Sequence, residues 1–465
     1  MRRVNMKRLC TLLLMLIHVG IHAQRLEVST NGRFLVTEDG APFFWLADTA
    51  WELFHRCDRA EAEMYLTKRA RQGFNVIQAV ALAELDGINT PNPYGQAPLL
   101  NLDPTTPNDR YFEHVDYIIR KADSLGLYIA LLPTWGDKVD TKSWGVGPEI
   151  FTPSNARVFG QWIGNRYKDL DNIIWIIGGD RNPRPDTDDV AIWNQMAEGI
   201  ALAAGGYDNT LMSFHPQPKD AGGSSTWFQQ EKWLDFNMHQ TGHCANQGTY
   251  KHITHDYDLA PTKPVIDGEP LYEDHPNCFN AKDLGHSVPE DIRRIMYWNV
   301  FAGAFGQSYG CHDVWQMYLT DKTPINQPLR PWPQALDLPM ANQAKHLKHL
   351  MLSRPFLTRI PDQSMIRGSQ PEDNHYKAAT RDSQGRYAMV YFPNGGKVTL
   401  DLSSMADKQL NTSWFDPRTG NAFDGETIRK ADEIHMQAPT TGKGHDWVLV
   451  IDGSTSHFSK AGQIK

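Results

Sequence analysis

The stretch Asn172-Ile-Ile-Trp-Ile-Ile-Gly-Gly-Asp-Arg-Asn-Pro183 decides the fold that the sequence predicts. Its apolar run is short and rich in β-branched residues, and two glycines and a charged cluster end it. This pattern is typical of a strand buried on both faces. Asp180 is the first charged residue after the run. α/β enzymes place their chemistry at the C-terminal ends of parallel strands, so we expect Asp180 to have a partner at another strand end.

Strand-like and helix-like segments alternate on both sides of this stretch. The strand-like runs are 43–47, 74–82, 127–132, 172–177, 211–214, 236–238, 264–269 and 306–310. The helical segments are 59–72, 108–126, 155–167, 190–204, 227–232, 290–301 and 334–352. Eight strands separated by helices predict an α/β fold in which parallel βαβ units close into a (β/α)8 TIM barrel. An open doubly wound sheet is the alternative, but no G-x-G-x-x-G follows the first strand.

The pattern divides the chain into three expected parts. Residues 1–23 combine a basic start, an apolar run and a small residue before a polar break, which predicts a secretory signal peptide. Residues 24–353 form the barrel and begin with a short β-cap, marked by turn pairs such as Asn31-Gly32. Residues 354–465 show alternating strands and turns and predict an antiparallel β-sandwich.

Composition and charge limit the partners of the exported chain. Hydrophobic residues make up 40% of the sequence and charged residues 22%, as in a globular protein. Loss of residues 1–23 removes four basic and no acidic residues, so the formal net charge falls from −8 to −12. An acidic protein argues against nucleic acid or anionic lipid as a partner. We expect a monomer in the periplasm, at the cell surface or outside the cell, without membrane insertion.

Four cysteines remain after the signal peptide: Cys57, Cys244, Cys278 and Cys311. In an exported protein they can form up to two disulfides, with three possible connectivities. A domain of this size does not need disulfides for stability, so free thiols remain an equal alternative.

Glu269 is the partner expected for Asp180. It ends the strand three places after the one that leads to Asp180, so both carboxylates should face the C-terminal mouth of a barrel. A glycosidase needs such a pair: one acid protonates the leaving oxygen, while the other carboxylate attacks the anomeric carbon or activates water. Gly178 and Gly179 would allow the backbone to approach the sugar closely. The alternative is a structural salt bridge between Asp180 and Arg181.

Polar and aromatic residues at the other strand ends are candidates for binding sugar. Histidines there could donate to hydroxyls, and tryptophans could stack on sugar rings. The candidates are Asp48, Trp51, Glu84, Trp135, Arg181, Asn182, His215, His239, Gln240, Tyr309, His312 and Trp315. His239 and His243 have the i, i+4 spacing of zinc ligands, but no H-E-x-x-H surrounds them. We therefore expect no metal and no cofactor.

Several motifs resemble those of one known family. Asp48-Thr-Ala-Trp51, Trp175-Ile-Ile-Gly-Gly-Asp-Arg-Asn-Pro183, Asp267-Gly-Glu-Pro270 and the stretch 306–316 are similar to the apiosidase-type barrel of glycoside hydrolase family 140. Trp414-Phe-Asp-Pro-Arg-Thr-Gly420 resembles the β-sandwich that follows it, which is labelled a collagen-binding domain. The resemblance implies that Asp180 is the acid/base and Glu269 the nucleophile of a retaining enzyme. It also implies a substrate in which apiose is linked to pectin, in rhamnogalacturonan II side chains.

Two other functions remain open at this stage. A non-catalytic surface protein that binds carbohydrate or collagen would also explain the aromatic content and the C-terminal domain. Such proteins tend to lose one carboxylate, whereas this chain keeps both Asp180 and Glu269. A barrel glycosidase that acts on a different sugar is the second alternative, because the loops 86–108, 136–151 and 243–261 shape the pocket.

Overall fold

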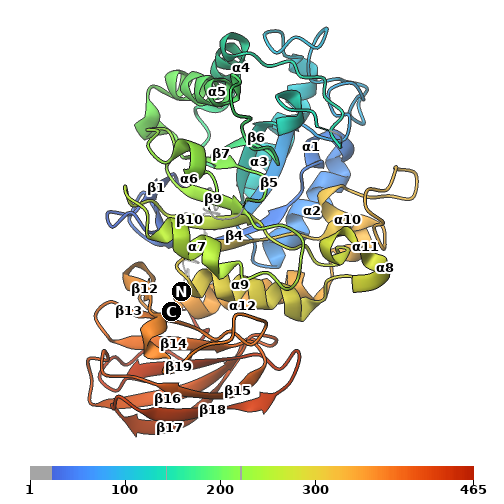
Figure 1. Ribbon diagram of the computed structural model, residues 1–465. Helices are drawn as coiled ribbons and strands as arrows, with labels where there is room; N and C mark the ends of the chain where they lie inside the picture. The colour runs from blue at the N-terminus through green and yellow to red at the C-terminus, as the bar shows by residue number, and fades with distance from the viewer. Residues whose placement is uncertain (1–22, 143, 220–221, 465) are drawn as a thin grey trace, which may run out of the picture.

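The structure is a computed structural model that describes residues 23–142, 144–219 and 222–464. The predicted signal peptide falls almost entirely on residues 1–22, which lie outside the described residues. Within the described ranges, no helix has both the length and the apolar character needed to span a membrane. The chain forms a large α/β part and, below it in Figure 1, a smaller part built of antiparallel strands.

Eight strands follow one another along the α/β part, near the positions expected from the sequence. They are β4 (Trp45–Thr49), β5 (Val76–Leu82), β6 (Tyr128–Thr134), β7 (Ile173–Gly178), β8 (Met212–His215), β9 (Asn237–Gln240), β10 (Val265–Glu269) and β11 (Gly306–Tyr309). All their pairings are parallel, in a six-stranded sheet of order β11-β4-β5-β6-β7-β8 and a two-stranded sheet of β9 and β10. The predicted parallel α/β architecture is confirmed.

The two parallel sheets lie against each other at both edges. The backbone N–H of Asp235, just before β9, donates to the carbonyl of Met212 in β8 at 2.9 Å. The N–H of Phe305, just before β11, donates to the carbonyl of Val265 in β10 at 3.1 Å. Within the described ranges no regular ladder continues across either edge, so the hydrogen-bonded sheet divides into these two portions.

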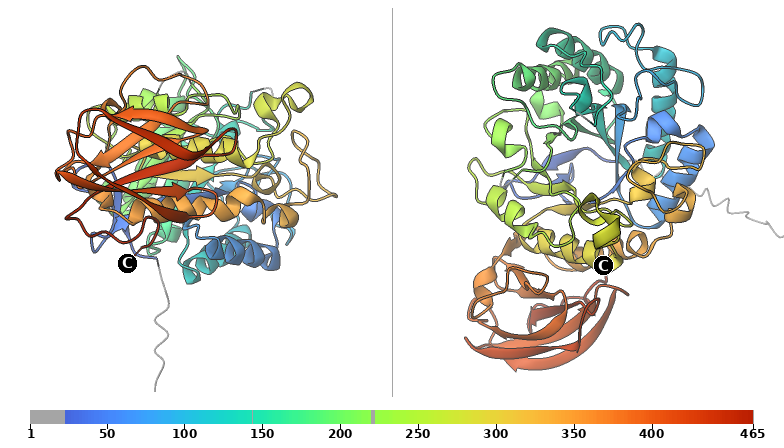
Figure 2. Two further views of the ribbon diagram at one scale, coloured as in Figure 1. Left: turned by 90° about the horizontal axis from the view of Figure 1, so that it is seen from below. Right: turned by 45° about the vertical axis from the view of Figure 1, so that its right-hand side comes forward.

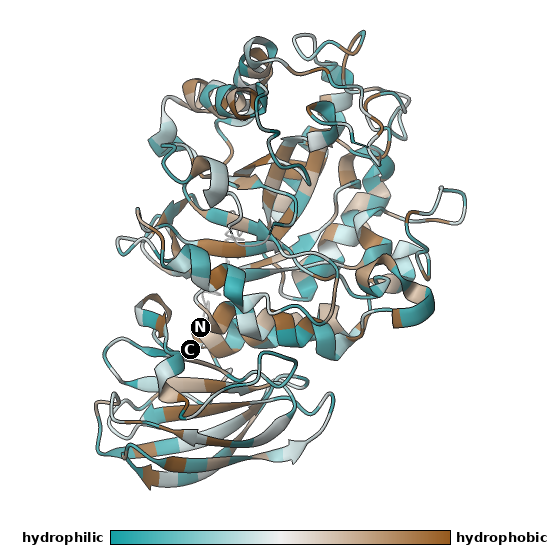
Figure 3. Cartoon of the chain, viewed as in Figure 1, coloured by the Kyte–Doolittle hydropathy of each residue, from teal (hydrophilic) through white to brown (hydrophobic). Residues whose placement is uncertain are grey.

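Helices surround the parallel strands, whose apolar residues show as brown bands in Figure 3. They are α1 (Leu53–Arg56), α2 (Arg59–Arg71), α3 (Asp109–Ser124), α4 (Pro153–Tyr167), α5 (Asp189–Ala204), α6 (Ser225–Phe228), α7 (Tyr250–Tyr257), α8 (Ala281–Leu284), α9 (Pro289–Phe301), α10 (His312–Trp315), α11 (Trp332–Ala335) and α12 (Pro339–Leu352). Local sequence sets their ends: Asp58 and Glu61 form a capping box at the start of α2. The backbones of α4 and α5 approach each other closely at Gly160. A Cβ at this position would lie only 2.3 Å from the Met196 carbonyl in α5, so the packing of the two helices requires glycine here.

A small antiparallel sheet precedes the first parallel strand. It contains β1 (Leu26–Val28), β2 (Leu35–Thr37) and β3 (Pro42–Phe43), in that order. The turn between β1 and β2 holds Gly32 at φ 67°, a conformation that favours glycine. The expected N-terminal β-cap is therefore present.

The C-terminal part consists of antiparallel strands, as predicted. They are β12 (Arg359–Pro361), β13 (Ala378–Asp382), β14 (Tyr387–Phe392), β15 (Gly395–Leu400), β16 (Gln409–Asp416), β17 (Asn421–Arg429), β18 (Ile434–Thr441) and β19 (Trp447–Gly453). One sheet has the order β12-β13-β14-β19-β16-β17, and the other pairs β15 with β18. Side chains from both sheets share one apolar cluster, which includes Val390, Leu400, Ala438 and Leu449.

Helices α9 and α12 separate the parallel strands from the C-terminal sheets, and Figure 2 shows the same two-part arrangement from two other directions. Arg293 of α9 binds the carboxylate of Asp446 through Nε and Nη2, at 2.8 to 3.2 Å. Both side chains are almost fully buried. Tyr297 of α9 stacks on Tyr391 of β14, with ring centroids 4.9 Å apart. The contact thus combines a desolvated ion pair with aromatic packing.

Breaking the Arg293–Asp446 pair should destabilise the protein strongly. Arg293→Ala leaves a buried carboxylate without its partner, which typically costs about 3–5 kcal/mol. We expect a clear fall in Tm and in the free energy of unfolding measured in denaturant. The control is Glu372→Gln, which removes the exposed ion pair of Glu372 with Lys251 between the same two parts. An Arg293→Ala variant as stable as this control would contradict the assigned role.

Candidate functional site

The backbone at the end of β7 is tightly packed and turns sharply. Gly178, Gly179 and Asp180 have φ values of 84°, 148° and 48°. A Cβ at Gly178 would lie 2.5 Å from the Phe214 ring, and one at Gly179 would lie 2.7 Å from the Trp135 ring. The sequence suggested that these glycines make room for sugar. The structure instead shows that they make room for side chains of the neighbouring strand ends.

Asp180 is held by donors from two directions. Arg181 donates to its Oδ2 through Nη1 at 2.9 Å, and Trp144 donates to the same oxygen through Nε1 at 3.3 Å. Arg181 is buried and also donates through Nε to the Asp140 carbonyl at 2.8 Å. The Asp180 side chain keeps 18% of its surface exposed. Its carboxylate is therefore fixed in place but open to a ligand.

Glu269 lies between two histidines at the end of β10. His243 contacts Oε1 through Nε2 at 3.2 Å, and His215 Nε2 lies 3.1 Å from Oε2. The backbone N–H of Asp180 donates to Nδ1 of the same His215 ring at 3.2 Å. Because Nδ1 accepts, the proton of neutral His215 lies on Nε2, facing Glu269. One imidazole thus contacts the backbone of Asp180 and the carboxylate of Glu269.

The two carboxyl groups have pKa shifts in opposite directions. Burial and the nearby Glu269 charge raise the pKa of Asp180, although Arg181 opposes them. Burial would also raise the pKa of Glu269, but the contacts with His215 and His243 outweigh it and lower that pKa. Asp180 is therefore suited to carry a proton and Glu269 to remain ionised. Two carboxyl groups whose pKa values are shifted in opposite directions can serve as acid and nucleophile.

Aromatic side chains form the floor beside His215. The Trp51 ring lies 5.1 Å from the Trp135 ring and 5.4 Å from the His215 ring, between centroids. Trp51 donates through Nε1 to the hydroxyl of Tyr272 at 3.1 Å. Burial and the Glu269 charge raise the pKa of Tyr272, so its hydroxyl stays protonated. Trp51 and Trp135 are only 1% and 2% exposed, so little of either ring is open to a sugar.

Several buried polar atoms near this floor have no hydrogen-bond partner in the part of the chain that the structure describes. Trp135 Nε1 and Gln240 Oε1 are buried and have no hydrogen-bond partner among the described residues. Gln240 pairs with Glu269 in the β9–β10 register, and its side chain also interacts with Asp180. Buried polar atoms normally have partners, so a substrate hydroxyl or water is expected here.

Three of the predicted sugar-binding residues make contacts within the protein. The Asp48 carboxylate is fully buried and accepts from Arg69 and Tyr65 of α2. His239 Nε2 lies 2.9 Å from the carboxylate of Asp256 in α7. The Tyr309 hydroxyl donates to Glu273 at 2.7 Å. The structure does not bring these three side chains to Asp180 and Glu269.

The zinc spacing of His239 and His243 does not produce a shared site. The Nε2 atoms of the two rings face different carboxylates, those of Asp256 and Glu269.

The remaining candidates lie around the same end of the strands. Burial and the charge of Asp180 raise the pKa of Glu84 well above its usual value, which places Glu84 near the site. Asn182 accepts from the Gln217 backbone at 3.0 Å and orders the loop after β8. The His312 ring donates through Nε2 to backbone carbonyls and accepts from Trp315 through Nδ1. These contacts give Asn182 and His312 structural partners of their own.

His243, Trp144 and Tyr272 contact the site but were not among the sequence candidates. The sequence suggests His243 only as a metal ligand, although this residue follows the strand end at Gln240 by three residues. Trp144 lies in the loop after β6, whose conformation the sequence does not reveal. Tyr272 lies three residues after Glu269, a position that could have suggested it.

A disulfide between Cys244 and Cys278 fixes the loop that carries His243. It joins the segment after β9 to the short helix η3 (Asn277–Phe279) after β10. The Cys278 N–H also donates to the His243 carbonyl at 2.7 Å. Cys57 and Cys311 are free and buried. The disulfide question left open by the sequence thus has one bridge as its answer, next to the candidate site.

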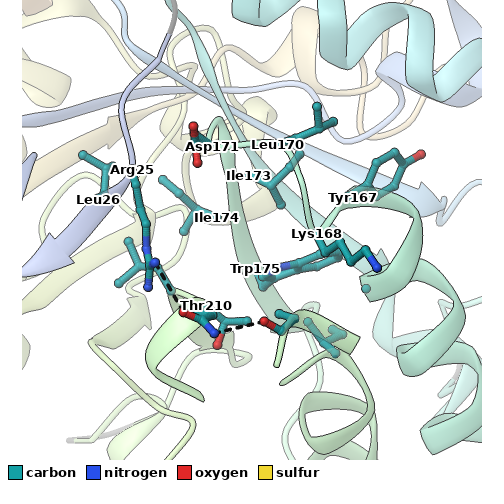
Figure 4. A pocket seen from close by; sticks show the side chains of 15 residues that line it. Arg25, Leu26, Tyr167, Lys168, Leu170, Asp171, Ile173, Ile174, Trp175 and Thr210 are labelled. Carbon is teal, nitrogen blue, oxygen red and sulfur yellow. Dashed lines mark hydrogen bonds between the residues drawn. The ribbon is translucent and has the colours of Figure 1, made fainter. Parts of the chain in front are cut away.

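A separate pocket lies at the opposite end of β7. Arg25, Tyr167, Lys168, Trp175 and Thr210 are among the residues around it (Figure 4). Because the segment before β7 contributes to this pocket, it is distant from the Asp180 end of the strand. We assign it no part in the chemistry of the carboxylates.

Comparisons with known proteins agree with this geometry. Residues 29–358 match the family described as "Apiosidase-like, catalytic domain", and residues 360–452 match the "Putative collagen-binding domain of a collagenase". A search of curated proteins finds no match. One similar solved structure is a glycoside hydrolase family 5 protein from Bacteroides vulgatus, with 33% identity, a TM-score of 0.85 and 95% of each chain covered. Another, titled a glycoside hydrolase, has 34% identity and a TM-score of 0.84, and the match covers 93% of this chain and 97% of the other.

Removal of the His243 side chain should shift the acidic limb of the pH–activity profile to higher pH. His243→Ala takes away a donor to Glu269, so the pKa of Glu269 should rise, by about one unit for one hydrogen bond. Because only the ionised form of Glu269 can act as a nucleophile or base, kcat/KM should begin to fall at a higher pH as the pH is lowered. His435→Ala, on an exposed strand of the C-terminal part, is the control. An unchanged acidic limb in His243→Ala would be evidence against the contact.

Loss of the disulfide should affect both stability and turnover. The bridge spans 34 residues, and a loop of that length corresponds to about 3–4 kcal/mol in the chain-entropy account. In the double variant Cys244→Ser/Cys278→Ser we expect a lower Tm and a several-fold lower kcat, because His243 loses its anchor. Dithiothreitol should reproduce the effect in the parent protein and add nothing to the double variant. Full activity in the reduced parent would refute the anchoring role.

Proposed function

Because this chain belongs to the apiosidase-like family of glycoside hydrolases, we propose that it is a retaining enzyme that cleaves apiosyl linkages in the rhamnogalacturonan II side chains of pectin. The observation that carries the proposal is the His215 contact with both Asp180 and Glu269, which have pKa shifts of opposite sign. Asp180 is the acid/base and Glu269 is the nucleophile. The family supports hydrolysis of a glycosidic bond, and the resemblance of the motifs supports apiose as the sugar.

The catalytic part is proposed to be a complete (β/α)8 barrel. The backbone hydrogen bonds from Asp235 to Met212 and from Phe305 to Val265 support closure at both edges of the parallel sheets. A further parallel bridge between Glu273 and Cys311 follows β10 and β11. In a closed barrel all eight strand ends surround one mouth, and the two carboxylates lie across it.

In the first step, Glu269 attacks the anomeric carbon of the sugar. The glycosidic C–O bond breaks, its electron pair goes to the leaving oxygen, and Asp180 gives that oxygen its proton. A covalent glycosyl-enzyme ester on Glu269 results. The Nε2–H of His215 keeps the attacking oxygen ionised, and Arg181 stabilises Asp180 once it is a carboxylate.

In the second step, Asp180 acts as a base. It takes a proton from a water molecule, which attacks the anomeric carbon and breaks the ester bond to Glu269. The sugar is released with its original anomeric configuration, and both carboxyl groups return to their starting state. The mechanism needs a separation of about 5–5.5 Å between the carboxyl groups, because the nucleophile reaches the sugar directly.

The proposed place of action is outside the cytoplasm, with the protein as a monomer. The basic and apolar pattern of residues 1–23 supports export. The Cys244–Cys278 bridge also supports an oxidising compartment, since disulfides persist there. A secreted enzyme would meet plant polysaccharide directly.

Substitution of either carboxylate should abolish turnover without unfolding the protein. Asp180→Asn and Glu269→Gln keep the shape of the side chains but remove the acid and the nucleophile, so we expect losses of roughly 10³-fold or more in kcat. Activity is measured on a panel of pectic oligosaccharides, and the released sugar is identified. Azide should restore turnover in Asp180→Ala with a retained glycosyl azide, and in Glu269→Ala with an inverted one. Near-normal rates in either variant would rule out the assignment, and release of a sugar other than apiose would correct the substrate.

A further inference from the structure

We propose that Trp144 is the platform on which the sugar of the leaving group stacks, and that it selects oligosaccharide substrates over those with a small leaving group. The inference rests on the proposed function, because the role of Asp180 as the acid defines the side on which the leaving group lies. Trp144 donates to Asp180 Oδ2 at 3.3 Å, so its indole borders the oxygen that protonates the leaving group.

Trp144 differs from the other tryptophans of the site in its exposure. Its side chain is 52% exposed, whereas Trp51 and Trp135 are almost completely buried. An exposed indole in an otherwise closed site loses apolar contact with the protein and offers a flat face to a ligand. Sugar rings present apolar C–H faces that fit such a surface, while the indole N–H marks the polar edge.

Contacts of the segment that follows Trp144 hold the loop in position. The Asp137 carboxylate accepts from the backbone N–H groups of Val146 at 3.3 Å and Gly147 at 3.0 Å. Asp137 is itself paired with Lys138 at 2.6 Å, and both side chains are fully buried. A binding platform gains affinity when it is ordered before the ligand arrives, because less conformational entropy is lost. The buried Asp137 provides that order for the segment after Trp144.

Arg181 connects the platform to the acid. Its guanidinium donates to Asp180 and to the Thr141 carbonyl, and its carbon Cζ lies 5.0 Å from the centre of the Trp144 ring. A cation at this distance attracts the aromatic face. The same buried Arg181 therefore sets the positions of Asp180 and Trp144 relative to each other. A leaving sugar that rests on the indole would present its glycosidic oxygen to Asp180.

Three variants and two substrates test this platform. Trp144→Ala removes the ring, Trp144→Phe keeps an aromatic face without the N–H, and Phe423→Ala removes an exposed aromatic from the C-terminal part as a control. The substrates are an apiosyl oligosaccharide from rhamnogalacturonan II and apiosyl fluoride, whose leaving group cannot stack. Calorimetry also measures the Kd of the oligosaccharide in a Glu269→Gln background, where no turnover occurs.

We expect Trp144→Ala to lower kcat/KM for the oligosaccharide about tenfold, mainly through KM, and to weaken its Kd similarly. The loss on apiosyl fluoride should be much smaller, and Trp144→Phe should retain most of the activity of the parent. Equal losses in Trp144→Ala and Trp144→Phe would overturn the platform, because the N–H contact with Asp180 would then be the important feature. An unchanged Kd would overturn it as well. A parent protein that is inactive on both substrates would instead refute the proposed function, and the platform with it.

Discussion

The contact of one histidine ring with two acidic residues determines the rest of the site. His215 accepts from the backbone of Asp180 and faces Glu269 with its protonated nitrogen. This geometry requires β7 and β8 in a fixed register, which pairs Gly178 with His215. It also requires the bend at Gly178 and Gly179, where any larger residue would strike Phe214 or Trp135. The packing of strand ends thus sets the surroundings of both carboxyl groups, whose pKa shifts have opposite signs.

Glu269 and Asp180 have different neighbours, and these neighbours favour different charges on the two side chains. Glu269 is almost buried, and an ionised carboxylate there is tolerated only because two imidazoles face its oxygens. Asp180 is more exposed and has Glu269 as an unfavourable neighbour, so protonation relieves repulsion. The opposite pKa shifts come from neighbours at the ends of β8 and β10 and in the loops after β7 and β9. The surroundings of both carboxyl groups in this chain therefore depend on the relative positions of its strand ends and loops.

The sequence predicted the strands well, because buried parallel strands are continuous apolar runs that end at polar residues. It also indicated Asp180, Glu269 and His215, which lie at those ends. It could not indicate which way each neighbouring side chain points. Gln240 points toward Asp180, whereas His239, one residue earlier, points to α7, as alternation along a strand requires. The positions of Trp144 and His243 depend on long loops and on a disulfide, whose pairing several cysteines leave undecided.

The contact between the two parts of the molecule limits how the protein can be divided. Arg293 lies on α9, the helix between β10 and β11, and its charge is neutralised by Asp446 of the C-terminal part. The α/β part expressed without the C-terminal part would lack the carboxylate that neutralises Arg293. The C-terminal part therefore stabilises the α/β part through this buried ion pair.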